Sequence, residues 1–198
     1  MQKPYLLDLI RRVQELTGIA LPIIVGSQSL FAITDDVPPI VRQSVEADFL
    51  IGQEGHEPRQ RINFELGVTS NFYDLHGYFA DALGLATVVL VPGWEERLQP
   101  LADETGTVVA RCLELHDVAV SKLMAGREKD FPFIQALLAR QLISLPTLVE
   151  RAALIQETAS AGALLPRLKM LYDHLRNQYG GIELKPLTDL IHELAAHP

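Results

Sequence analysis

Two carboxylates placed two positions apart could bind one cation. Glu46 and Asp48 alternate with apolar residues. These apolar neighbours are Val45, Ala47, Phe49 and Ile51. Because side chains of a strand alternate between its faces, a strand over 44–51 would put both carboxylates on one face. Carboxylate oxygens suit Mg²⁺, which commonly takes one or two of them together with water and substrate phosphates. The alternative is that both acids lie on the solvated face of an amphipathic strand.

A second stretch could hold the phosphates of such a substrate. The apolar run over 19–25 predicts a buried strand, and Gly26-Ser27 then opens an expected short helix over 27–33. A glycine at this junction lets phosphate approach the backbone, and the first N–H groups of a helix attract anions. The alternative is that Ser27 only caps the N-terminus of the helix.

A third polar segment follows much later in the chain. Its sequence is Lys122-Leu123-Met124-Ala125-Gly126-Arg127-Glu128-Lys129-Asp130. Apolar residues at helical spacing predict a helix over 116–126, from which Lys122 could reach toward bound phosphates. Arg127 and Lys129 come at or just beyond its end. The alternative is a solvated face with ordinary charges, in which Asp130 begins the next helix.

The elements that must position these residues form an α+β core followed by helices. Apolar periodicity predicts a first helix from Leu6 to Leu16 that stops at Gly18. Two further strands are expected at 86–91 and 105–112, a helix is possible at 58–66, and the aromatic stretch 67–84 has no clear period.

The C-terminal half reads as helical throughout. Helices are expected at 116–126, 131–142, 147–158, 162–178 and 186–196. Gly180-Gly181 is expected to end the fourth of them. We therefore expect two domains, a core over 1–114 and a helical lobe over 115–198 that packs on it.

Composition limits the class of protein. The 198 residues carry 17 basic and 25 acidic side chains, a net charge of −8, which argues against a broad basic surface that coats nucleic acid. The single cysteine, Cys112, cannot form an intrachain disulfide and favours a reducing compartment. No apolar run approaches the ~20 residues that span a bilayer. A cytoplasmic protein without a membrane partner is expected.

Taken together, Gly26-Ser27, Glu46-Ala47-Asp48 and the segment from Lys122 to Asp130 resemble the minimal nucleotidyltransferases of the polymerase-beta superfamily. The most similar branch contains the AbiEii-type toxins of bacterial toxin–antitoxin pairs and related uncharacterised bacterial proteins. The resemblance implies a small mixed nucleotidyltransferase-type sheet flanked by helices.

The resemblance also implies roles for individual residues. Gly26 and Ser27 would hold the triphosphate, and Glu46 and Asp48 would bind Mg²⁺ as catalytic carboxylates. Lys122 and Arg127 would contact the nucleotide, with Lys122 and Asp130 as further catalytic residues. The implied reaction moves a nucleotidyl group from a nucleoside triphosphate to an acceptor hydroxyl of RNA or protein. A cognate antitoxin or other partner protein would accompany it.

Three departures from the family pattern motivate an alternative. Glu46 stands where Asp is usual, and the gap between Ser27 and Glu46 is longer than in the most compact members. No third strand carboxylate is recognisable, and Glu114 is the only acid in the fourth expected strand region. The alternative is a catalytically silent nucleotidyltransferase-like protein that serves as a binding or antitoxin-type partner module through its C-terminal helices.

Overall fold

The computed structural model describes residues 1–52, 56–178 and 183–196. The chain divides into two compact units, residues 1–88 with 95–114 and residues 89–94 with 115–198. Within the described ranges, no helix combines the length and the apolar character needed to cross a membrane.

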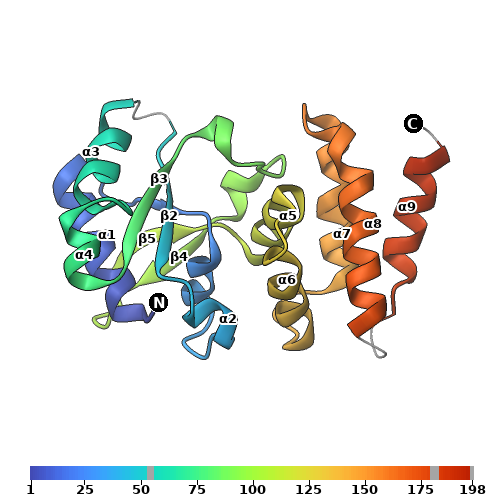
Figure 1. Ribbon diagram of the computed structural model, residues 1–198, viewed down its shortest axis with the longest axis horizontal. Helices are drawn as coiled ribbons and strands as arrows, with labels where there is room; N and C mark the ends of the chain where they lie inside the picture. The colour runs from blue at the N-terminus through green and yellow to red at the C-terminus, as the bar shows by residue number, and fades with distance from the viewer. Residues whose placement is uncertain (53–55, 179–182, 197–198) are drawn as a thin grey trace. The chain divides into compact units, whose positions relative to one another are not determined.

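The first unit is built on a five-stranded mixed sheet in the order β3-β2-β1-β5-β4 (Figure 1). Its strands are β1 (Ile23–Ile24), β2 (Glu46–Leu50), β3 (Phe79–Leu83), β4 (Gln99–Ala102) and β5 (Val108–Cys112). β2 runs parallel to β3 and antiparallel to β1, while β1 runs parallel to β5 and β5 antiparallel to β4. The predicted α+β class with a mixed, helix-flanked sheet is confirmed.

Helices cover one face of this sheet. The helices of the unit are α1 (Lys3–Thr17), α2 (Pro39–Arg42), α3 (His56–Leu66) and α4 (Asn71–His76), with short 3-10 helices η1 (Ser27–Ala32) and η2 (Leu85–Thr87). A further 3-10 helix, η3 (Trp94–Arg97), begins at the last residue of the 89–94 segment and continues into the first unit. Figure 1 shows α1, α3 and α4 gathered on one side of the strands. α1 forms as predicted, because its buried residues recur at helical spacing and Gly18 ends it at a φ of 74°.

The pattern of burial fixes which face of β2 and β3 carries the acids. Ala47, Phe49 and Ala80 are fully buried, and Ala82 nearly so. Since alternate residues of a strand point to opposite faces, the residues between them lie on the other face of the sheet. That other face carries Glu46, Asp48 and Asp81.

Several strand predictions are corrected by the structure. The strand expected over 19–25 shrinks to Ile23–Ile24, and the strand expected at 86–91 is wrong, because η2 begins at Leu85 and the next residues pair with no described strand. An apolar run alone does not distinguish a strand from other buried backbone. β3 lies instead inside the stretch 67–84. β4 was not predicted, and Pro100 is tolerated in it because β4 is at the edge of the sheet.

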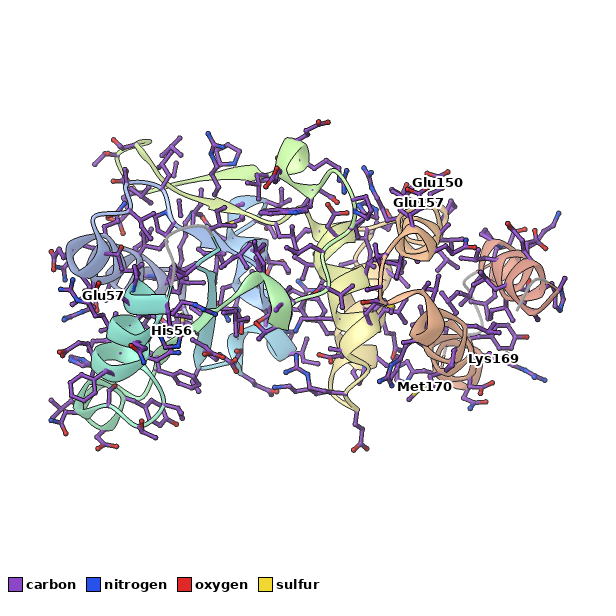
Figure 2. All side chains as sticks on the ribbon, turned by 90° about the horizontal axis from the view of Figure 1, so that it is seen from above. His56, Glu57, Glu150, Glu157, Lys169 and Met170 are labelled. Carbon is purple, nitrogen blue, oxygen red and sulfur yellow. The ribbon has the colours of Figure 1, made fainter. Side chains whose placement is uncertain are left out.

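The second unit is helical, as predicted. It contains α5 (Leu115–Ala125), α6 (Asp130–Ala139), α7 (Leu145–Ala153), η4 (Leu154–Glu157), α8 (Ala161–Gln178) and α9 (Lys185–Ala196). Figure 2 shows the polar side chains of Glu150, Glu157 and Lys169 extending outward from α7, η4 and α8. The expected helix stop at Gly180-Gly181 lies outside the described residues.

Candidate metal and nucleotide site

Three carboxylates lie together on the face of the sheet opposite the buried alanines. Glu46 and Asp48 of β2 and Asp81 of β3 are all partly buried, and each offers an oxygen that lies within 4.8 Å of the other two. The parallel register explains this, because it pairs Asp48 directly with Asp81 and Glu46 with Phe79. Like charges directly opposite each other destabilise a sheet. A bound cation would remove that repulsion.

The ionisation of Asp81 reflects this crowding. The pKa of Asp81 is raised above its ordinary value, first because burial disfavours its charged form and second because the negative charge of Glu46 is close by. An all-oxygen donor set with three carboxylates has the chemistry that hard divalent cations such as Mg²⁺ require. The residues therefore fit a divalent metal ion.

Metal affinity should consequently fall on acidification sooner than for ordinary aspartates. A carboxylate must lose its proton to bind metal, and Asp81 holds its proton up to a higher pH than usual. Titration calorimetry with Mg²⁺ or Mn²⁺ between about pH 8 and about pH 5 tests this. Affinity that stays constant over this pH range would contradict the expectation.

The raised pKa of Asp81 also makes the stability of the metal-free protein depend on pH. Between the ordinary pKa of 3.8 and the raised folded pKa, the folded protein binds more protons than the unfolded chain. The contribution of Asp81 to the free energy of unfolding is therefore present below 3.8 and is lost as pH rises through the folded pKa.

Gly26 is required by the position of Asp48. A Cβ atom added at Gly26 would lie 1.6 Å from the Oδ2 atom of Asp48. The backbones are also joined, because the N–H of Val25 donates to the carbonyl oxygen of Asp48 at 3.0 Å. The glycine thus makes room for a carboxylate of the acidic group, a contact that links the two predicted motifs directly.

Ser27 does not cap the helix that follows. Gly26 is the N-cap residue of η1, and no side chain forms the cap hydrogen bond. The Ser27 hydroxyl oxygen accepts a hydrogen bond from Nε2 of Gln28 at 3.4 Å, and Ser27 is 9% exposed. Because Ser27 Oγ accepts here, its own O–H remains available to donate to a ligand.

Gln28 carries a buried polar atom that sequence reasoning did not single out. Its side chain is fully buried, and in the part of the chain that the structure describes its Oε1 atom has no hydrogen-bond partner. A buried acceptor without a partner costs about 1–3 kcal/mol. Buried polar groups of this kind are uncommon and require an explanation.

Gln28→Leu should therefore leave the free energy of unfolding unchanged or raise it, by up to about 2 kcal/mol, because the substitution removes the unsatisfied acceptor while keeping apolar volume. Denaturant unfolding of the two proteins measures this. Ser29→Ala is a matched comparison, since the Ser29 hydroxyl donates to the carbonyl of Ile24 at 3.0 Å and its loss should destabilise. Destabilisation by Gln28→Leu as large as that by Ser29→Ala would contradict the expectation.

The later motif forms a separate ion-paired cluster inside the second unit. Asp130 begins α6, and its side chain is 1% exposed. It accepts hydrogen bonds from the backbone N–H and the Nε of Arg127 at 3.1 and 3.0 Å, and the Nζ of Lys122 lies 3.5 Å from its other oxygen. The same ammonium lies 4.8 Å from the ring centre of Phe133. These contacts link the end of α5 to the start of α6.

The comparison with protein families assigns the chain. Residues 5–170 match a family described as nucleotidyltransferase of unknown function (DUF6036). The chain belongs to this nucleotidyltransferase family. Neither curated proteins nor solved structures gave a match.

The matched region covers all three predicted motif stretches, from Gly26 through Asp130. It thereby supports the expected nucleotidyltransferase-like family, a nucleotide as the implied substrate, and a metal-binding role for the acidic group. Glu46 lies with the other two carboxylates despite its longer side chain.

The member of the acidic group that sequence reasoning missed is Asp81. Glu114 follows β5 and is not a member of the acidic group found among the described residues. A signal was present, because Phe79-Ala80-Asp81-Ala82-Leu83 places one acid between small apolar residues with a period of two. The short length of this alternation and the surrounding aromatic residues concealed it.

Proposed function

We propose that this nucleotidyltransferase uses Mg²⁺ to transfer a nucleotidyl group from a nucleoside triphosphate to an acceptor hydroxyl, with the chemistry in the first unit. The observation that carries the proposal is the group formed by Glu46, Asp48 and Asp81, whose oxygens lie within 4.8 Å of one another. Membership of a nucleotidyltransferase family supports it independently.

The proposed reaction is a displacement at phosphorus. The acceptor oxygen forms a bond to the α-phosphorus, the bond from that phosphorus to the bridging oxygen breaks, and pyrophosphate leaves. A bound Mg²⁺ would neutralise charge on the phosphate oxygens and orient them. We assign the hydroxyl proton to Asp81, whose carboxylate lies beside the two carboxylates of β2. Ser27 would donate its hydroxyl proton to a phosphate oxygen.

The resemblance to the polymerase-beta superfamily extends the proposal. Lys122 and Arg127 are proposed to bind the nucleotide, and Asp130 is the proposed acidic residue that orients both cations through the ion pairs at 3.5 and 3.0 Å. We further propose that the protein belongs with the AbiEii-type toxins, acts on RNA or a protein hydroxyl, and works with a cognate antitoxin or partner protein.

The catalytically silent alternative loses one of its reasons. Its motivation was the presence of Glu46 and the lack of a recognisable third carboxylate. Asp81 completes a group of three carboxylates that could hold a divalent ion. We therefore favour the enzyme over a silent partner module.

The test is a transfer assay with the purified protein, Mg²⁺, each labelled nucleoside triphosphate, and total cellular RNA or protein as acceptor. We expect label on one acceptor fraction, with release of pyrophosphate, and loss of both in Glu46→Ala and Asp48→Ala. Glu104→Ala is a matched control, because Glu104 is exposed and outside the acidic group. Absence of both nucleotide binding and transfer with every nucleotide would overturn the proposal and favour the silent module.

A further inference from the structure

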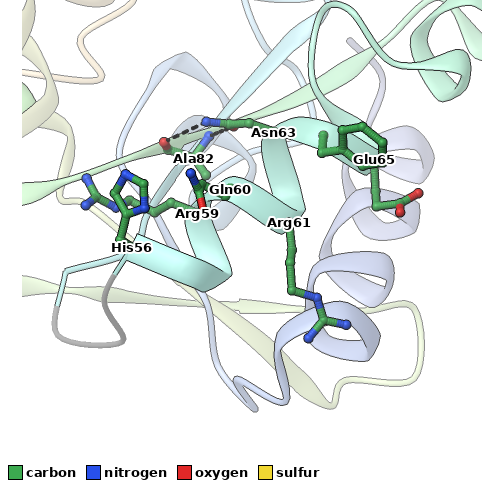
Figure 3. Close-up of a pocket in the computed structure, with 8 residues that line it drawn as sticks. His56, Arg59, Gln60, Arg61, Asn63, Glu65 and Ala82 are labelled. Atoms are coloured by element: carbon green, nitrogen blue, oxygen red, sulfur yellow. Dashed lines mark hydrogen bonds between the residues drawn. The ribbon is translucent and has the colours of Figure 1, made fainter.

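A cavity lies within the first unit between α3 and β3. It has a volume of about 620 Å³. It is lined by His56, Arg59, Gln60, Arg61, Asn63, Phe64 and Glu65 of α3 together with Ala82 of β3 (Figure 3). Ala82 neighbours Asp81 in β3 and points to the opposite face of the sheet. This α3 cavity is therefore distinct from the acidic group.

Among the charged residues that line the α3 cavity, Arg59 is partly buried, whereas Arg61 and Glu65 are exposed. The guanidinium of Arg59 lies against the backbone at Gly84, where an added Cβ would be 2.1 Å from Nη1. Its Nε is buried without a hydrogen-bond partner, and among the described residues no carboxylate forms an ion pair with it. A chain with 25 acidic and 17 basic residues offers many partners. A partly buried arginine that pairs with none of the described acids is suited to an external anion.

Two other residues that line the α3 cavity, Asn63 and Phe64, limit the class of ligand that it can bind. Asn63 accepts a hydrogen bond from the N–H of Ala82 at 2.8 Å and donates one to its carbonyl at 3.4 Å, so the edge of β3 is already occupied at this point. A peptide added as a further strand is therefore disfavoured. Phe64 is 79% exposed and offers an aromatic face at the same cavity. An arginine and an exposed aromatic ring that line one cavity are typical of sites for single-stranded nucleic acid.

We infer that the α3 cavity binds single-stranded RNA, with Arg59 holding a phosphate and Phe64 stacking on a base. The inference rests on the proposed function in one respect, that this RNA is the acceptor. Gly84 follows Asp81 by three residues, about 10 Å along the strand. RNA with a phosphate held by Arg59 would thus pass the end of β3. Asp81 would then lie about one or two nucleotides from that phosphate.

The test measures RNA binding without Mg²⁺ or nucleoside triphosphate. A fluorescently labelled single-stranded oligoribonucleotide is titrated with the full-length protein at several salt concentrations. Arg59→Gln should lower affinity about tenfold and reduce the salt dependence by about one phosphate contact. Arg111→Gln is the matched control, because it removes the same charge from an exposed position in the same unit, and Arg111 does not line the α3 cavity. It should change affinity by less than about twofold.

Phe64→Ala provides a second variant with little risk to folding, since the ring is 79% exposed. It should lower affinity about tenfold by removing one stacked base. Equal losses in Arg59→Gln and Arg111→Gln would overturn the inference in favour of general electrostatic attraction. Failure of the unmodified protein to bind RNA would overturn it as well, and would direct the search to a protein ligand.

The two proposals fail in different ways. Glu46→Ala should lose transfer and keep RNA binding, because Glu46 is on the other face of the sheet. Transfer to a protein acceptor with no RNA binding would refute only the inference about the α3 cavity. RNA binding through Arg59 with no transfer of any nucleotide would refute only the proposed function.

Discussion

Asp81→Asn is expected to lower metal-dependent nucleotidyl transfer by about a thousandfold while stabilising the metal-free protein. The substitution keeps the size of the side chain and removes one of three carboxylate oxygens that lie within 4.8 Å of one another. Metal binding should weaken, because two acids remain where three would share the cation's charge. Stability should rise, because the pKa of Asp81 is raised by burial and by Glu46, so its charge is disfavoured in the folded protein.

The opposite directions of these two effects make the test decisive. Initial rates, Mg²⁺ titrations and denaturant unfolding should be measured on the same preparations, with Glu104→Gln as a matched control outside the acidic group. Unchanged rates in Asp81→Asn would remove this residue from the site. Loss of stability together with activity would assign Asp81 a structural role instead.

Gly26→Ala is expected to be nearly as damaging, although it removes no functional group. The new Cβ would lie 1.6 Å from Oδ2 of Asp48, so the carboxylate must leave its position. The backbone itself would tolerate alanine, since Gly26 has a φ of −95°. We expect at least about a hundredfold loss of transfer and about 1–3 kcal/mol of destabilisation from the overpacking.

A double-mutant cycle shows whether the collision with Asp48 is the cause. In an Asp48→Ala background, Gly26→Ala should cost much less stability, because the oxygen that it meets is gone. Gly162→Ala in α8 is a control for adding one methyl group, since no atom lies within 4 Å of where its Cβ would stand, and it should be neutral or stabilising by up to about 1 kcal/mol. Equal destabilisation by Gly26→Ala in both backgrounds would exclude the proposed contact.

The sequence predicted β2 well because its alternation is local and unbroken. Glu46 and Asp48 share a face for that reason alone. β3 was missed because alanine and aspartate are uncommon in strands, so its extended form depends on pairing with β2. The close approach of Gly26 to Asp48 is likewise a contact between distant segments. No local pattern encodes it.

The helical unit was easier to predict for the same reason. Leu164, Leu168, Leu171 and Leu175 of α8 recur at helical spacing, and all are buried. Spacing also indicated that Lys122, Arg127 and Asp130 belong to one polar cluster. The near-complete burial of Asp130 could not be predicted, because it depends on how α5 and α6 pack within their unit.

The amide of Asn63 has a consequence for the behaviour of the protein in solution. β3 is the last strand of the sheet on its side, and an outermost strand invites pairing with another chain. The side-chain amide of Asn63 accepts a hydrogen bond from the N–H of Ala82 and donates one to its carbonyl oxygen. It thus makes the two hydrogen bonds that a further strand would otherwise make with Ala82. The strand that bears Asp81 can thereby stand at the border of the sheet without recruiting a second molecule into an aggregate.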